Sequence, residues 1–264
     1  MRLYDTHCHF EAADPSAIAA TLDRARTAGV EKLMAVGGSA ALNGSALVAA
    51  QCAAEAIVSP QVRVALGYDR DQTAAFRADP DAACRQLATL LADNPTVAAV
   101  GEIGLDYHET REFAQEQKEA LRIQLELASR LDLPVSIHLR DATEDFLRII
   151  EDSKGLHLRG SLHAFSSSHE FYERVARTGD WYVGIGGVVT FKNASIAEEI
   201  RHIPLERIVL ETDSPCLSPT PLRGTRNENS RLPLIAAKIA AQKGVTIEEV
   251  ASVTTASARR LFGI

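Results

Sequence analysis

Two histidines near the start of the chain are spaced so that both can bind one metal ion. His7 and His9 lie two residues apart in the stretch Asp5-Thr6-His7-Cys8-His9. If this stretch is a strand, side chains two residues apart share a face, so Asp5, His7 and His9 point one way and Cys8 the other. The plain alternative is a pair of buried rings hydrogen-bonded to the backbone, and a His-x-His pair alone does not exclude it.

Acidic and imidazole side chains recur where later apolar runs stop, and this recurrence favours a metal site. The run Val97–Val100 is followed by Glu102, and the run Val135–Ile137 by His138. In a parallel α/β barrel the carboxyl ends of the strands together form the active site, so the shared placement is a stronger signal than any single residue. The side chains placed in this way are Glu102, His138, His163, Glu211 and Asp213.

The mixture of ligand types indicates the kind of metal and the number of ions. Imidazole nitrogens with carboxylates suit zinc or manganese, whereas magnesium prefers oxygen ligands and retained water, so the identity of the metal stays open. The candidates outnumber the ligands of one tetrahedral ion with an open position, which favours two ions that share a carboxylate. We expect His7, His9 and Asp213 at one ion, His138 and His163 at the other, and Glu102 as the bridge.

A pair of metal ions defines a class of reaction. Such ions stabilise the attacking and the leaving oxygen of a displacement at phosphorus, so hydrolysis of a phosphoester is the first expectation. Asp213 would orient or deprotonate the attacking water. Barrels with such sites also cleave small amides, esters or phosphoesters, which is the alternative. A metal-binding regulator without turnover is disfavoured, because Glu102 and Asp213 would supply a bridge and a base that binding alone does not require.

Arginines follow the same strand ends. Arg140, Arg223 and Arg226 come just after the fifth and eighth apolar runs, in a chain whose formal net charge is −7. Each alone is most simply a solvated surface charge. Their shared placement in an acidic chain predicts a rim that binds the phosphates of a substrate.

Eight apolar runs alternating with helical segments, about thirty residues apart, predict a closed (β/α)8 TIM-type barrel with residues 1–264 as a single domain. A doubly wound open sheet is disfavoured, because no Gly-x-Gly-x-x-Gly follows the first strand and because closure is needed to gather the candidate ligands. The expected strands are Leu3–His9, Lys32–Val36, Val62–Leu66, Val97–Gly101, a fifth from Pro134, a sixth ending at His163, Trp181–Ile185 and Arg207–Glu211.

Local signals place the helices between these strands. Asp14-Pro15 and Asp79-Pro80 read as an N-cap followed by proline in the first turn. Thr246 and Glu249 have the spacing of a capping box. The segment from about Glu112 to Leu131 carries an apolar stripe suited to packing on a sheet, made of Ala120, Leu121, Gln124, Leu125 and Ala128.

Composition limits the partners and the compartment. Polar residues interrupt the alanine-rich segment Ala40–Val58, so no membrane span is expected. The net charge of −7 argues against a surface that coats nucleic acid broadly, although a local basic patch is compatible with it. Four cysteines without a Cys-x-x-Cys pair, and the absence of a leader-like start, favour a cytoplasmic protein, expected as a monomer or weak oligomer.

The motifs together resemble the TatD-type deoxyribonucleases, a family of metal-dependent hydrolases, over essentially the whole chain. The resemblance rests on Asp5–Phe10, Gly101–Tyr107, Ile137–Ala142, His163–Ser166, Glu211–Pro215 and Arg223–Glu228. It implies a (β/α)8 barrel, hydrolysis of DNA phosphodiesters, often from a 3′ end, and divalent-metal binding at the matching His7, His9, Glu102, His138, His163 and Asp213. The chain departs from the family in Gly67-Tyr68-Asp69-Arg70, where Gly-x-His-Pro is usual, and this departure predicts a different substrate pocket.

Overall fold

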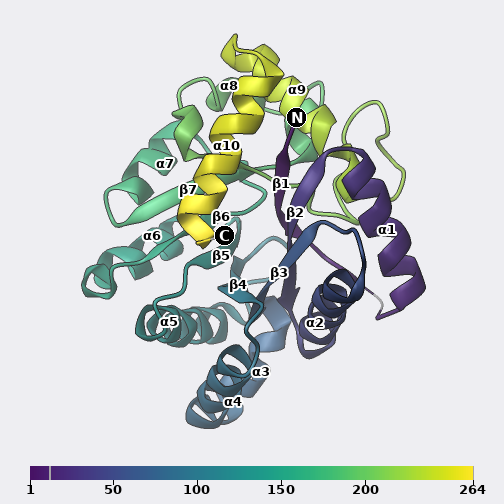
Figure 1. Ribbon diagram of the computed structural model, residues 1–264. Helices are drawn as coiled ribbons and strands as arrows, with labels where there is room; N and C mark the ends of the chain where they lie inside the picture. Colours follow the sequence, from purple (N-terminus) through teal and green to yellow (C-terminus); the bar gives the residue numbers. More distant parts are fainter. Residues whose placement is uncertain (12, 264) are drawn as a thin grey trace.

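The computed structural model describes residues 1–11 and 13–263, and its centre is one sheet of eight parallel strands (Figure 1). Each strand pairs with the next one in the chain, from β1 to β8. The predicted (β/α)8 barrel is therefore confirmed. The strands are β1 (Leu3–Cys8), β2 (Val30–Gly38), β3 (Gln61–Tyr68), β4 (Val97–Asp106), β5 (Val135–Arg140), β6 (Arg159–Leu162), β7 (Asp180–Ile185) and β8 (Ile208–Leu210).

The first and last strands meet through short contacts that close the barrel. Cys8 and Ser214 form an isolated parallel bridge, and the His9 N–H donates to the Ser214 carbonyl at 2.7 Å. The Asp213 N–H donates to the His7 carbonyl at 2.9 Å, and the Thr6 hydroxyl donates to the Leu210 carbonyl at 3.0 Å. Closure therefore places the segment after β8 directly beside the end of β1.

Helices surround the sheet, and several begin where the sequence predicts. The Asp14 carboxylate accepts from the Ser16 N–H at 3.0 Å, and the Asp79 carboxylate from the Ala82 N–H at 2.9 Å. These bonds satisfy N–H groups that have no partner within the first turn. The helices are α1 (Pro15–Thr27), α2 (Ala40–Glu55), α3 (Ala74–Ala78), α4 (Pro80–Ala92), α5 (Ala114–Arg130), α6 (Thr143–Asp152), α7 (His169–Ala176), α8 (Ile196–Glu199), α9 (Leu232–Lys243) and α10 (Ile247–Phe262).

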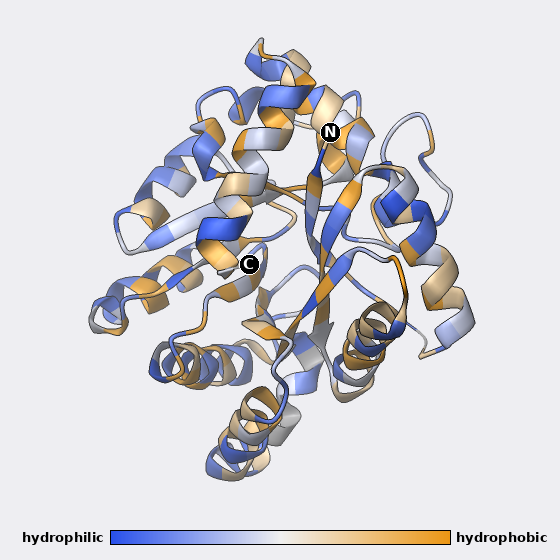
Figure 2. Cartoon of the chain, in the orientation of Figure 1, coloured by the Kyte–Doolittle hydropathy of each residue, from blue (hydrophilic) through white to orange (hydrophobic). Residues whose placement is uncertain are grey.

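The helices bury one face against the sheet. All members of the stripe predicted on α5 are buried: Ala120, Leu121, Gln124, Leu125 and Ala128. Hydrophilic and hydrophobic residues alternate around the helices in Figure 2, as amphipathic packing requires. Within the described residues, no helix combines the length and the apolar character that crossing a membrane demands.

Several strand ends differ from the sequence-based expectation by one or more residues, and those of β4 and β8 bear on the site. β4 continues to Asp106 instead of ending at Gly101, because its pairing with β5 persists as far as Asp106 beside Arg140. Glu102 therefore belongs to the strand itself. β8 covers only Ile208–Leu210, which leaves Glu211 outside the regular pairing.

One end of the barrel is closed by a helix. Leu261 and Phe262 of α10 pack with Tyr4, Met34 and Tyr182 in a buried apolar cluster that is separate from the larger core between the sheet and the helices. In Figure 1 the yellow helix α10 crosses the strands at this amino-terminal end. The opposite, carboxyl-terminal end is left for polar side chains.

Candidate metal centre

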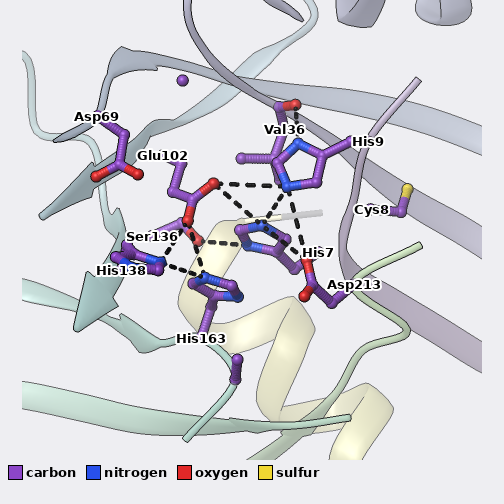
Figure 3. A network of polar contacts seen from close by, with 12 residues as sticks. His7, Cys8, His9, Val36, Asp69, Glu102, Ser136, His138, His163 and Asp213 are labelled. Carbon is purple, nitrogen blue, oxygen red and sulfur yellow. Dashed lines mark hydrogen bonds and ion pairs between the residues drawn. The ribbon is translucent and has the colours of Figure 1, made fainter. Parts of the chain in front are cut away.

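His7 and His9 bring two ring nitrogens to one point. Their Nε2 atoms are 3.1 Å apart, and the side chain of Cys8 is directed away from both rings (Figure 3). The other nitrogen of His9, Nδ1, lies 2.9 Å from the Val36 carbonyl. A carbonyl only accepts, so Nδ1 carries the proton and a neutral His9 presents a bare Nε2, the form that binds a metal.

The His7 ring is held by a residue that the sequence did not suggest. Its Nδ1 lies 3.0 Å from the hydroxyl of Ser136, which is fully buried on β5. The ring also stacks on His163 at a centroid distance of 3.8 Å. Nothing distinguishes a serine in the middle of an apolar strand in the sequence, so only the fold reveals this contact.

His138 and His163 form a second converging pair. His138 Nδ1 is 3.2 Å from His163 Nε2. The opposite nitrogen of His138, Nε2, lies 2.9 Å from the carboxylate of Asp106, and this hydrogen bond lowers the pKa of Asp106 to about 2. An ionised carboxylate only accepts, so Asp106 fixes the ring orientation and leaves Nδ1 facing His163. Asp106 was also missed as a site residue, although it lies four residues after Glu102.

The carboxylate of Glu102 lies between the two pairs, and each of its oxygens faces a different pair (Figure 3). Oε2 is 3.5 Å from His9 Nε2 and 3.8 Å from His7 Nε2. Oε1 is 3.0 Å from His138 Nδ1 and 2.9 Å from His163 Nε2. This is the arrangement that a carboxylate shared by two ions requires.

Asp213 lies beside the rings of His7 and His9. Its Oδ1 is 3.6 Å from His9 Nε2 and 3.9 Å from His7 Nε2. The backbone of Asp213 has a φ of 51°, a conformation that residues other than glycine seldom adopt. The side chains can therefore hold ions in two groups, His7, His9 and Asp213 in one and Glu102, His138 and His163 in the other, with the ligand atoms of each group within 4.8 Å of one another.

The charges of this cluster favour a cation within it. Burial opposes protonation of His138, but hydrogen bonds to Asp106 and Glu102 raise the pKa of His138 to about 9. Burial raises the pKa of Asp213 to about 6, against the opposing charges of His163 and His9. Without an ion, protons on the imidazoles supply the positive charge that the carboxylates demand. Ions held by the same nitrogens would supply it instead, so the residues fit a divalent metal.

Glu211 lies behind His163. The glutamate is fully buried, its Oε1 accepts from the Ala164 N–H at 2.5 Å, and the same oxygen lies 3.7 Å from His163 Nδ1. Among the described residues, Glu211 Oε2 and His163 Nδ1 have no hydrogen-bond partner. The sequence left Glu211 open as a ligand or a supporting group. In the structure, ligand atoms of Glu211, His7 and His163 lie within 4.8 Å of one another, so these three side chains form a third group that could hold an ion.

Asp5 does not join the cluster, although strand alternation puts it on the face of His7. Its carboxylate accepts from the Thr212 hydroxyl at 2.6 Å and from the Asn229 amide at 2.8 Å. The pairing of β1 with β2 shifts register between Asp5 and Cys8, which breaks the regular alternation. Asp5 therefore ties β1 to the segment after β8 and so supports the position of Asp213.

The three arginines expected at the rim lie in different places. Arg140 lines a cavity of about 500 Å³ together with Glu102, His138, His163 and Asp213. Arg223 is stacked over the Phe191 ring at 4.3 Å. Arg226 is paired with Glu11 at 2.8 Å and lines a neighbouring cavity of about 240 Å³, which His9 also borders. Only Arg140 of the three lines the larger cavity, and Arg70, which was not predicted, lines it as well.

The chain is similar to known proteins in sequence and in fold. The model of the family described as TatD related DNase matches residues 4–263. An uncharacterised metal-dependent hydrolase of Bacillus subtilis, YabD, is 35% identical over 265 aligned residues, which cover 99% of each chain. The 3′-5′ ssDNA/RNA exonuclease TatD of Salmonella typhimurium is 35% identical over 180 residues, covering 66% of this chain and 69% of the relative.

Solved structures agree with this match. The crystal structure of YJJV, a TatD homologue from Escherichia coli, superposes with a TM-score of 0.87 at 28% identity, covering 100% of this chain and 98% of the other. The similarity extends over the whole barrel.

Proposed function

The chain belongs to the TatD related DNase family and is a metal-dependent hydrolase, and from this premise we propose that it hydrolyses DNA phosphodiester bonds, with single strands and strand ends as substrate. The observation that carries the proposal is the position of Glu102, whose two carboxylate oxygens face two separate groups of ligands. That arrangement suits two ions, and a pair of ions stabilises the attacking and leaving oxygens of a displacement at phosphorus.

The six residues named from the sequence would hold two divalent ions. His7, His9 and Asp213 would bind the first, His138 and His163 the second, and Glu102 both. When bound, such ions lower the pKa of water and stabilise negative charge on the attacking and leaving oxygens. Zinc and manganese suit this donor set better than magnesium, because four of the six ligands are imidazoles.

The side chains around the ions would have different roles in the reaction. Asp213 borders the cavity and would orient the attacking water and accept its proton through a carboxylate oxygen. Asp106 and Ser136 would keep the rings of His138 and His7 in their orientations. Arg140 would bind a non-bridging oxygen of the substrate phosphate, since a guanidinium matches phosphate oxygens in pairs.

The substrate assignment draws on two further points. One relative carries the name 3′-5′ ssDNA/RNA exonuclease. In addition, arginines border both the cavity at the ligand groups and the neighbouring one, so that a linear anion could contact a cation in each. A small amide or ester would not need cations in two neighbouring cavities.

The proposal is tested by comparing substrates with the protein loaded with manganese or zinc. We expect hydrolysis of single-stranded oligonucleotides and little hydrolysis of small amides or carboxylic esters. Glu102→Ala should reduce turnover by about a thousandfold or more, because it removes a ligand from both ion sites. Glu126→Ala, on the exposed surface of α5, is the matched control and should retain full activity. A protein that cleaves amides and leaves oligonucleotides intact would contradict the proposal.

A further inference from the structure

A second arginine, Arg70, borders the cavity beside the ligand groups. Arg70 lies just after β3, and Arg140 ends β5, so these two cations flank Glu102 on the strand between them. The Arg70 side chain is about half exposed, at 51%. Among the contacts of the described side chains, its guanidinium donates through Nε. Because the side chain lines the cavity and is half exposed, its guanidinium can contact a molecule there.

Arg70 is held by a buried carboxylate. Its Nε donates to Asp69 Oδ2 at 2.8 Å, and the Asp69 side chain is only 6% exposed. The Asp69 N–H donates to the Gly38 carbonyl at 2.9 Å, which anchors this residue to the end of β2. The Thr73 hydroxyl donates to the Arg70 carbonyl at 2.7 Å. Both the backbone and the guanidinium of Arg70 are thus fixed in place.

This arrangement is unfavourable for the isolated chain. Arg70 has a φ of 44°, in the left-handed region that residues with a side chain rarely adopt. The buried Oδ1 of Asp69 has no hydrogen-bond partner among the described residues. Burial, reinforced by the charge of Glu102, raises the pKa of Asp69. A strained backbone and a buried carboxylate beside a cation that lines a cavity are typical of a functional site.

We propose that Asp69 and Arg70 form a substrate-positioning pair, in which Arg70 binds the phosphate adjacent to the scissile one and Asp69 fixes the guanidinium. This inference rests on the proposed phosphodiesterase function and deepens it. Because Arg140 already lies at the same cavity, Arg70 would recognise a second phosphate. The substrate class is therefore a chain with at least two successive phosphodiesters, in preference to an isolated phosphodiester.

The test compares a long and a minimal substrate in the metal-loaded protein. For Arg70→Ala, kcat/KM on trithymidylate should fall by roughly tenfold or more, mainly through KM, since charge-assisted contacts to phosphate are of that strength. The value for bis(p-nitrophenyl) phosphate should change by less than about twofold, because this ester has no adjacent phosphate. Arg70→Lys should recover part of the loss. Arg77→Ala, an exposed arginine of α3, is the matched control and should match the parent on both substrates.

A double-mutant cycle separates positioning from other roles of Asp69. Asp69→Asn should raise KM for trithymidylate in the same direction as Arg70→Ala and should have no further effect once Arg70 is alanine. The metal content of Asp69→Asn should equal that of the parent. Calorimetric binding of trithymidylate with phosphorothioate linkages provides a readout without turnover, and Arg70→Ala should weaken it by the same factor.

Several outcomes overturn the inference. Equal losses on both substrates in Arg70→Ala would place Arg70 at the scissile phosphate or in the scaffold. A reduced metal content in Asp69→Asn would make Asp69 part of the metal centre. If the parent cleaves trithymidylate and Arg70→Ala does so equally well, the positioning pair fails while the proposed function stands. If the parent cleaves no phosphodiester at all, the proposed function itself fails.

Discussion

The two ends of this barrel are built from the same strands and have opposite character. At the carboxyl-terminal end, β1, β4 and β5 present imidazoles and carboxylates whose charges oppose one another. At the amino-terminal end, the same sheet presents Tyr4, Met34 and Tyr182, which α10 covers with Leu261 and Phe262. Residues that stabilise the fold therefore lie at one end of the strands, and residues that could bind metal lie at the other, as is general in parallel barrels.

Left-handed backbone conformations occur at both ends, since Asp132 and His157, which precede β5 and β6, also have positive φ values, but several of them border the cavity at the carboxyl-terminal end. Arg70, Ala164 and Asp213 have positive φ values, and each lies in a segment that follows a strand. Such conformations cost free energy and persist only where surrounding contacts enforce them. The apolar end and the core between the sheet and helices provide that enforcement, so the polar end can carry strain and uncompensated charge.

The largest effect on stability is expected from truncation at the amino-terminal end. Leu261→Ala should lower the free energy of unfolding by about 2–4 kcal/mol, because Leu261 is 2% exposed and its loss leaves a cavity beneath α10. The number of bound ions and the kcat of the folded protein should stay as in the parent, measured by elemental analysis and by assay well below the unfolding temperature. Loss of metal in this variant would show that packing at the amino-terminal end controls the metal centre, contrary to the separation of the two ends.

A change of pH should have a smaller effect on the free energy of unfolding of the metal-free protein, because groups at the carboxyl-terminal end of the barrel titrate. The folded pKa of His138, about 9, exceeds its ordinary value of 6.5 because Asp106 and Glu102 outweigh burial. The stabilisation from this group is therefore complete below pH 6.5 and is lost as the pH rises through about 9. Burial raises the pKa of Asp5 to about 7, which acts in the same direction. Glu102, whose pKa is lowered by the charge of His163 despite burial, contributes a constant amount across this window.

Denaturant unfolding between pH 6.5 and 9.5 in a chelator checks this expectation. The free energy of unfolding should decline by an amount on the order of 1–3 kcal/mol. His138→Gln should flatten the decline, and bound metal should reverse it, since ions replace the protons more readily as pH rises. A metal-free protein whose stability increases from pH 6.5 to 9.5 would contradict the electrostatic description of the cluster.

The barrel and the ligand cluster could be predicted from the sequence, because both depend on local and periodic signals. The positions of His7, His9, Glu102 and His138 relative to apolar runs predict their convergence once the strands are parallel and closed. Asp14 and Asp79 mark helix starts through chemistry confined to a few residues. These features require no knowledge of which side chains meet across the barrel.

The remaining features depend on contacts between distant elements. Ser136 supports His7 across the interior of the barrel, and the extension of β4 to Asp106 follows from its pairing with β5. Arg70 lines the cavity from a left-handed backbone position after β3, which the sequence does not indicate. Conversely, Arg223 and Arg226 have the sequence placement of Arg140 but are engaged by Phe191 and Glu11. Placement after a strand end does not determine where a long side chain points.

If Glu102 joins two ion sites, the number of ions bound per chain should show it. The metal-free protein should be loaded with manganese or zinc, freed of excess ion and measured by elemental analysis. We expect about two ions per chain in the parent and in Glu126→Ala, and fewer than one in Glu102→Ala, because the carboxylate of Glu102 faces both groups of ligands. A parent that binds one ion per chain at saturation, or a Glu102→Ala variant that retains two, would contradict it.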